Sequence, residues 1–77
     1  MSHTQLTEVI NNNNVPLGVR ELLFKLNQEL QLNVLYDDQG MHNEYFMYGL
    51  IIFYPNGTSK TIQYAYDRTK KIHLLLT

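Results

Sequence analysis

The alternation of apolar and polar residues is clearest between residues 45 and 66, where it predicts an antiparallel β-hairpin. The chain is expected to turn at Pro55-Asn56-Gly57. Pro55 suits the first central position of a type I turn and Asn56 the second, while Gly57 takes the left-handed position of a G1 bulge. The predicted connection is therefore a three-residue loop.

This loop decides which residues lie opposite one another. It pairs Leu50 with Ile62, and Tyr48 with Tyr64. One face then carries bulky side chains from both strands, namely Phe46, Tyr48, Leu50, Ile52, Ile62, Tyr64 and Tyr66. The other face is apolar on the first strand and mostly polar on the second, with Met47, Gly49, Ile51 and Phe53 beside Ser59, Thr61, Gln63 and Ala65. A two-residue turn would place Lys60 opposite Phe53, which is a poorer match.

Two segments show helical spacing. Residues 17–31 carry one apolar stripe, formed by Val19, Leu22, Leu23, Leu26 and Leu30, with Pro16 at a first-turn position. Phe24 falls outside that stripe. Residues 4–10 repeat the spacing over two turns, with Thr4 as the expected N-cap. An Asn-rich loop over residues 11–14 separates the two helices.

Shorter strands complete the predicted fold. Residues 34–36 read as a strand closed by a turn over residues 37–40, where Gly40 supplies a positive φ. Residues 72–76 form a final strand after a turn over residues 67–71. We therefore expect one α+β domain spanning residues 1–77, with a short N-terminal helix and one main helix packed on a three- to four-stranded antiparallel β-meander. Within it, residues 1–14 are the short helix and linker, 15–32 the main helix, and 33–77 the sheet.

Composition narrows the classes of function. The 77 residues include no cysteine, which excludes disulfides and cysteine-based zinc or redox motifs. Six Lys and Arg residues against seven Asp and Glu give a net charge of −1, without the basic excess typical of nucleic-acid binders. There is no signal-peptide pattern and no apolar run of membrane-spanning length. We expect a cytoplasmic protein without a membrane partner.

Few residues suggest a catalytic or metal-binding role. Asp37, Asp38, His42 and Glu44 could meet at a metal, but their spacing matches neither HExxH nor an EF-hand. Acidic residues beside a glycine are also ordinary turn chemistry. His73 lacks a neighbouring nucleophile and orienting carboxylate, and His3 lies at the N-terminus. We therefore expect no catalytic residue, no metal and no cofactor.

The strand over residues 45–54 is apolar on both faces, and one helix can cover only one of them. Four large apolar side chains would then remain exposed to solvent, namely Phe24, Met47, Ile51 and Phe53. Their exposure favours a protein partner or a second copy of the chain. The predicted function is a non-enzymatic protein-interaction module, a small regulator or inhibitor. It would be homodimeric and act through its sheet face or, by β-augmentation, through its edge strand.

The alternative is a regulator that binds nucleic acid. Tyrosines displayed on a sheet can stack on bases while nearby cations hold phosphates, and the candidates are Tyr64, Tyr66, Arg68, Lys70 and Lys71. Against this, solvated lysines are common in turns, and the tyrosines are equally suited to the core.

Overall fold

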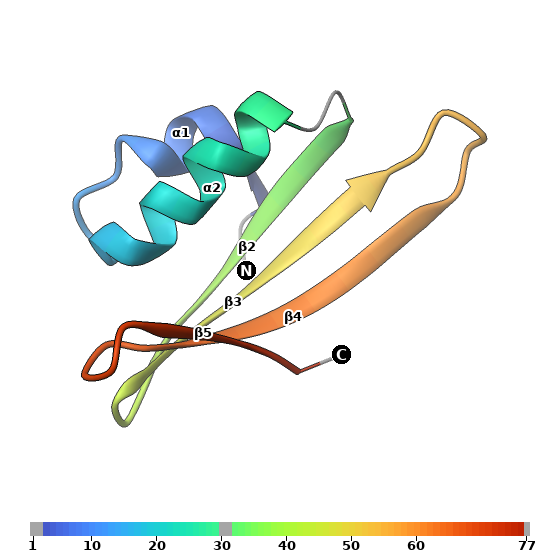
Figure 1. Ribbon diagram of the computed structural model, residues 1–77. Helices are drawn as coiled ribbons and strands as arrows, with labels where there is room; N and C mark the ends of the chain where they lie inside the picture. The colour runs from blue at the N-terminus through green and yellow to red at the C-terminus, as the bar shows by residue number, and fades with distance from the viewer. Residues whose placement is uncertain (1–2, 30–31, 77) are drawn as a thin grey trace.

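The computed structural model describes residues 3–29 and 32–76 of the chain. They form one antiparallel sheet and two helices, in the order β1 (His3–Gln5), α1 (Leu6–Ile10), α2 (Leu17–Glu29), β2 (Asn33–His42), β3 (Tyr45–Phe53), β4 (Ser59–Asp67) and β5 (Ile72–Leu75). The strands lie side by side in chain order, and both helices lie on the same face of the sheet (Figure 1). The α+β class is confirmed, but the sheet has five strands rather than three or four.

The predicted hairpin between β3 and β4 is confirmed in its register. Phe46 pairs with Tyr66, Tyr48 with Tyr64, and Leu50 with Ile62. The Tyr54 amide donates a hydrogen bond to the Thr58 carbonyl at 2.9 Å, and the Gly57 amide donates one to the Tyr54 carbonyl at 3.1 Å. Gly57 has a φ of 89°, a region that favours glycine because a Cβ is strained there. Local turn chemistry therefore sets the register of the central strands.

The strand predicted over residues 34–36 is longer than expected, because β2 runs on to His42. Residues 37–40 do not close it. They contain a β-bulge between Asp38 and Gly40, where Gly40 has the expected positive φ, 76°. The Gly40 amide donates a hydrogen bond to Asp38 Oδ1 at 2.9 Å. Asp-x-Gly chemistry thus makes a bulge here, and the chain reverses at Asn43, whose φ is 59°.

The N-terminal prediction also needs correction. Thr4 is not a helix cap but lies in β1, opposite Tyr36 of β2. Helix α1 begins at Leu6 after Gln5, which makes no side-chain cap. The extended start is favoured because it pairs backbone groups along the edge of β2 that a longer helix would leave unpaired. The shortened helix still buries Leu6 and Val9.

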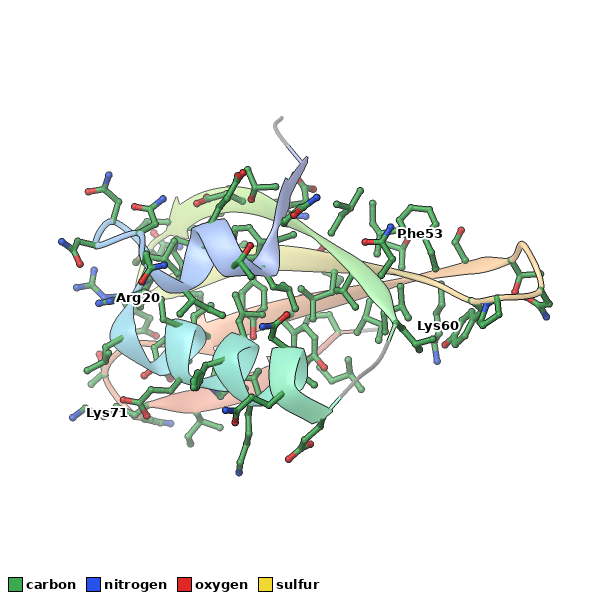
Figure 2. The ribbon with its side chains drawn as sticks, turned by 90° about the horizontal axis from the view of Figure 1, so that it is seen from above. Arg20, Phe53, Lys60 and Lys71 are labelled. Atoms are coloured by element: carbon green, nitrogen blue, oxygen red, sulfur yellow. The ribbon has the colours of Figure 1, made fainter. Side chains whose placement is uncertain are left out.

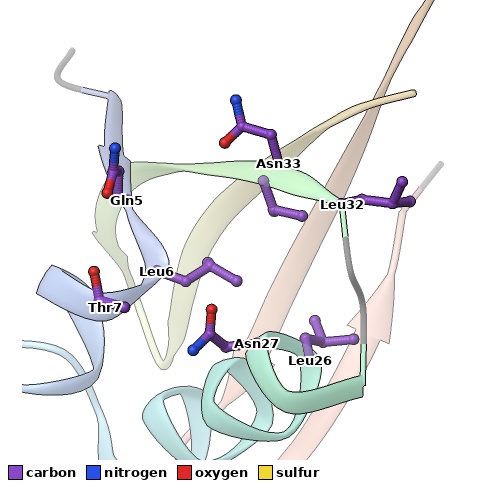
Figure 3. A pocket seen from close by; sticks show the side chains of 8 residues that line it. Gln5, Leu6, Thr7, Leu26, Asn27, Leu32 and Asn33 are labelled. Atoms are coloured by element: carbon purple, nitrogen blue, oxygen red, sulfur yellow. The ribbon is translucent and has the colours of Figure 1, made fainter. Parts of the chain in front are cut away.

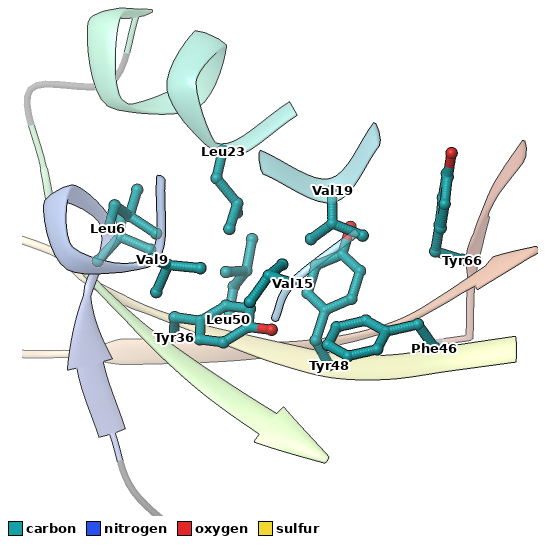
Figure 4. Packing of buried hydrophobic residues seen from close by; sticks show 11 residues of the cluster. Leu6, Val9, Val15, Val19, Leu23, Tyr36, Phe46, Tyr48, Leu50 and Tyr66 are labelled. Atoms are coloured by element: carbon teal, nitrogen blue, oxygen red, sulfur yellow. The ribbon is translucent and has the colours of Figure 1, made fainter. Parts of the chain in front are cut away.

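The predicted stripe of α2 faces the sheet. Val19 and Leu23 are fully buried, and Leu22 and Leu26 are partly buried against them. Leu30 lies outside the described residues. Figure 4 shows side chains from both helices meeting the aromatic residues of the sheet. Tyr48 stacks between Tyr36 and Tyr64, with ring-centroid distances of 5.8 and 5.2 Å.

Neither described helix is long and apolar enough to cross a membrane.

Candidate interaction surfaces

The face of the sheet opposite the helices has no covering element among the described residues (Figure 1). The register places several apolar side chains on it: Leu35, Met47, Ile51, Phe53, Ile72 and Leu74. Phe53, Ile72 and Leu74 are 38%, 47% and 41% exposed, whereas the remaining three are partly buried by their neighbours. We call this set the uncovered face. Its six side chains come from β2, β3 and the edge strand β5.

A pair of amide side chains crosses the middle of the uncovered face. Gln39 Nε2 donates a hydrogen bond to Gln63 Oε1 at 2.9 Å, and Gln63 Nε2 donates one back to Gln39 Oε1. The pair passes over Gly49, where an added Cβ would lie 3.3 Å from Gln39 Nε2. Glycine therefore leaves room for the bridge. The bridge separates the apolar residues into a group near the β3–β4 turn and a group near β5.

Asp37 lies beside this bridge and is 8% exposed. Its Oδ2 accepts a hydrogen bond from Gln39 Nε2 at 3.2 Å, but its Oδ1 is buried without a hydrogen-bond partner. Buried carboxylate oxygens are normally satisfied, because leaving one unpaired costs free energy. The uncovered face therefore contains a hydrogen-bond acceptor that the described part of the chain does not use.

The four residues predicted to bind a partner are not on one surface. Met47, Ile51 and Phe53 share the uncovered face. Phe24 projects from α2 on the helical side of the molecule, where it is 41% exposed beside Leu17. The structure thus brings three of the four together and leaves Phe24 apart, with the sheet between them.

A second surface lies at one end of the molecule, between the first turn of α2 and the turn that joins β4 to β5. It is an open groove of about 510 Å³, lined by Pro16, Leu17, Gly18, Glu21, Tyr66, Arg68, Lys71 and His73. Arg20 borders a neighbouring cleft that shares Arg68. Figure 2 shows Arg20 and Lys71 at this end of the molecule and Lys60 at the opposite end. We call the groove of about 510 Å³ the basic groove.

Asp67 holds the turn that presents the cations of the basic groove. Its Oδ1 accepts hydrogen bonds from the Thr69 and Lys70 amides at 3.0 and 3.1 Å. Its carbonyl accepts one from the Lys71 amide at 2.7 Å. Asp67 itself is 5% exposed, so its carboxylate serves the turn rather than solvent. The arrangement fixes Arg68 and Lys71 on one side of α2.

The tyrosines predicted to stack on bases lie on the face that the helices cover. Tyr64 is partly buried against Tyr48. Tyr66 is 5% exposed and packs against Gly18 of α2 and the ring of His73, with ring centroids 4.6 Å apart. The ring of Tyr66 is therefore not displayed for stacking. Arg68, Lys70 and Lys71 are exposed, and a role for them with nucleic acid stays a prediction.

His73 belongs to both the core and the basic groove. Its Nδ1 lies 3.2 Å from the Tyr48 hydroxyl. Burial lowers the pKa of His73, and the backbone of Gly18 partly opposes that change. Burial also raises the pKa of Tyr48, so its hydroxyl stays protonated and donates. The neutral imidazole is therefore the form that suits this site.

The residues considered for a metal site do not converge. His42 Nε2 lies 3.1 Å from the Gln39 carbonyl, and Glu44 is in the β2–β3 turn. Asp37 takes part in the amide network, and Asp38 supports the bulge. Among residues 3–29 and 32–76, no group of three or more His, Asp or Glu side chains is arranged to hold a metal ion.

A smaller cavity of about 140 Å³ lies where the end of α2 meets the starts of α1 and β2 (Figure 3). Gln5, Thr7, Asn27 and Asn33 give it a mixed polar lining with Leu6, Leu26 and Leu32. Pockets for organic ligands usually measure about 300–1,000 Å³, so this cavity is small for such a role.

Sequence reasoning did not place α2 beside the cations of the basic groove. The sequence contained one indication of an anion site at the start of α2. Val15-Pro16-Leu17 offers no Ser, Thr, Asp or Asn side chain to cap the helix that follows. An uncapped helix start leaves amide groups open to another acceptor.

Comparison with protein-family models, curated proteins and solved structures finds no significant match for this chain.

Proposed function

We propose that this protein is a non-enzymatic protein-interaction module, a small regulator or inhibitor, and that its uncovered face binds a second copy of the chain. The observation that carries the proposal is that both helices lie on one face of the sheet. The other face keeps Ile51 and Phe53 near the β3–β4 turn and further apolar residues on β5, with nothing over either group in the described structure. Exposed apolar surface of this kind, here divided by a polar bridge, marks interaction sites.

The size of the uncovered face suits a dimer. A strand of nine residues is roughly 30 Å long, and five strands spaced about 4.8 Å apart span roughly 20 Å. The face therefore offers on the order of 600 Å² per copy, and two copies would bury on the order of 1,200 Å², the lower end of the range for specific interfaces. The net charge of −1 adds little repulsion between two copies. A two-fold arrangement would let each copy cover the same apolar residues of the other.

Asp37 supports the same proposal. Its buried Oδ1 has no partner in the described part of the chain, so a donor from across the interface would satisfy it once the side chain turns outward. The Gln39–Gln63 bridge beside it adds a polar centre to an apolar surround. Such a centre favours one register of the two copies over others, because a shifted register would bury these groups unpaired.

The decisive comparison uses two phenylalanines of nearly equal exposure on opposite sides of the molecule. Phe24 and Phe53 are 41% and 38% exposed. We expect wild-type protein to elute as a dimer in size-exclusion chromatography with light scattering at micromolar concentration. Phe53→Lys and Ile51→Lys should give folded monomers, whereas Phe24→Lys should remain dimeric. Circular dichroism of each variant checks that the fold is kept.

A wild-type monomer over the whole micromolar range would contradict self-association. Equal loss of dimer in Phe24→Lys and Phe53→Lys would contradict the choice of face. Hydrogen exchange separates face from edge, since pairing through β5 would slow exchange of its outward amides upon dimerisation, whereas packing through the face would leave them unchanged.

A further inference from the structure

The basic groove carries positive charge that the described residues do not neutralise. Arg68 and Lys71 line it, and neither forms an ion pair within residues 3–29 and 32–76. The guanidinium of Arg68 lies 3.9 Å from Met41 Sδ, which is a weak acceptor. Glu21 is the single acidic side chain among the lining residues. Because two cations and one carboxylate line the groove, its charge favours the binding of an anion.

The start of α2 adds backbone donors to the same groove. The Pro16 carbonyl accepts hydrogen bonds from the Val19 and Arg20 amides at 3.0 and 3.1 Å, so the helix is well formed from its first turn. The amides of Leu17 and Gly18, which line the groove, have no partner in the described part of the chain. Pro16 has no side chain that could cap them. Free amides at the positive end of a 13-residue helix attract anions.

Tyr66 supplies an independent observation. The side chain is 5% exposed, and its hydroxyl lies against Gly18 at the lining of the groove. No described residue accepts a hydrogen bond from this hydroxyl. The hydroxyl itself is open to the groove, so a ligand bound there can supply its acceptor.

We propose that the basic groove binds the phosphate group of a small phosphomonoester, on a surface distinct from the uncovered face. Arg68 and Lys71 supply the charge, the Leu17 and Gly18 amides and the Tyr66 hydroxyl supply neutral donors, and a dianionic phosphate supplies the acceptors. The groove of about 510 Å³ is larger than a phosphate requires and leaves room for the organic part of the molecule.

The test is a titration of the 15N-labelled chain with adenosine 5′-monophosphate as the probe. We expect saturable shifts centred on the Leu17 and Gly18 amides. Inorganic phosphate should compete for the same amides, and adenosine without phosphate should not shift them. The titrations with inorganic phosphate and with adenosine separate recognition of the phosphate from recognition of the nucleoside.

Variants then assign the donors. Arg68→Ala should weaken binding about tenfold, because a charge-assisted contact is lost. Tyr66→Phe keeps the buried ring and should weaken binding about fivefold through loss of one hydrogen bond. Glu21→Gln should tighten binding about threefold by removing repulsion. Lys60→Ala is the control, since Lys60 lies at the opposite end of the molecule (Figure 2) and its loss should leave the affinity unchanged.

The proposal is overturned if the Leu17 and Gly18 shifts do not saturate, or if Lys60→Ala weakens binding as much as Arg68→Ala. It is also overturned if an oligothymidine without terminal phosphate binds more tightly than the monophosphate and depends equally on Arg68. That result would favour the nucleic-acid alternative. None of these outcomes depends on whether the uncovered face dimerises.

Discussion

The Tyr48 hydroxyl lies 3.2 Å from Nδ1 of His73 and connects the buried centre of the sheet to its edge strand β5. Tyr48 is fully buried and keeps its proton, so its hydroxyl donates and the neutral imidazole accepts. A protonated imidazole carries a hydrogen on that nitrogen and cannot accept. The contact therefore requires His73 in its neutral form.

This requirement makes the stability of the fold depend on pH. Burial lowers the pKa of His73 in the folded state below its unfolded value of about 6.5. Between those two pKa values the unfolded chain binds the additional proton, so the contribution of His73 to the free energy of unfolding decreases as the pH falls through about 6.5 and is constant above it. Urea unfolding measured from about pH 8 down to pH 5 should show this slope.

The control for the pH effect is a pair of histidine variants. His73→Asn should remove the slope above about pH 5, whereas His42→Asn, at an exposed position, should retain it. The other groups that face His73 are Tyr48 from β3, Tyr66 from β4 and Glu21 from α2, with Arg68 and Lys71 lining the same groove. An unchanged slope in His73→Asn would assign the effect to one of them.

Tyr48→Phe tests the hydrogen bond itself. The substitution keeps the stacked ring between Tyr36 and Tyr64 and removes only the hydroxyl. We expect a loss of about 1–2 kcal/mol in the free energy of unfolding, because Nδ1 of His73 is left without its donor. Chemical denaturation measures the loss. In the His73→Asn background Tyr48→Phe should cost less, and equal costs in the two backgrounds would show that the two residues are not coupled.

Gly18→Ala separates helix propensity from packing. Propensity alone predicts that alanine stabilises a helix by about 1 kcal/mol relative to glycine. The Cβ of an alanine at this position would overlap the Tyr66 hydroxyl and lie 2.5 Å from Cζ of the same ring. Because Tyr66 is buried under α2, moving its ring aside would disturb its packing, and we expect a net loss of about 1–3 kcal/mol.

A double variant checks this cause. Tyr66→Leu shortens the side chain and removes the atoms that the new Cβ would meet. Gly18→Ala should therefore cost less in the Tyr66→Leu background than in the wild-type chain, measured by thermal unfolding. A stabilising effect of Gly18→Ala in the wild-type chain would contradict the close approach of α2 to Tyr66.

The parts of the fold that could be predicted are those fixed by neighbouring residues. The β3–β4 register follows from Pro55-Asn56-Gly57, because turn geometry determines which residues face each other. The stripe of α2 likewise predicts Val19 and Leu23 as core residues. The positive φ of Gly40 was also predicted, although a bulge and a turn need the same conformation and only pairing with β3 decides between them.

What could not be predicted depends on residues far apart in the chain. Thr4 lies in a strand because Tyr36 of β2 offers it an edge, a partner more than thirty residues away. Burial of Tyr66 depends on the absence of a side chain at Gly18. The basic groove needs α2 to lie beside the β4–β5 turn, and no local pattern specifies that approach. The uncovered face was predicted from Met47, Ile51 and Phe53, but the position of Phe24 was not.

Asp37 and Asp38 are adjacent aspartates for which we expect opposite effects on stability. Asp38 Oδ1 accepts the Gly40 amide at 2.9 Å and supports the bulge, so Asp38→Ala should lower the free energy of unfolding by about 1 kcal/mol. Asp37 has a buried oxygen without a partner in the described chain. Asp37→Thr removes that oxygen and places a β-branched residue in a strand, so it should raise the free energy of unfolding of the monomer by about 1 kcal/mol.

The same substitution at Asp37 should weaken self-association, because a donor from the second copy loses its acceptor. Urea unfolding at low concentration reports the monomer, and light scattering across a concentration series reports the dimer. A residue that lowers the stability of the monomer while strengthening its assembly is expected at an interaction site. If Asp37→Thr instead destabilises the monomer, its carboxylate supports the fold. If it stabilises the monomer and leaves the dimer unchanged, the unpaired oxygen does not contact the second copy.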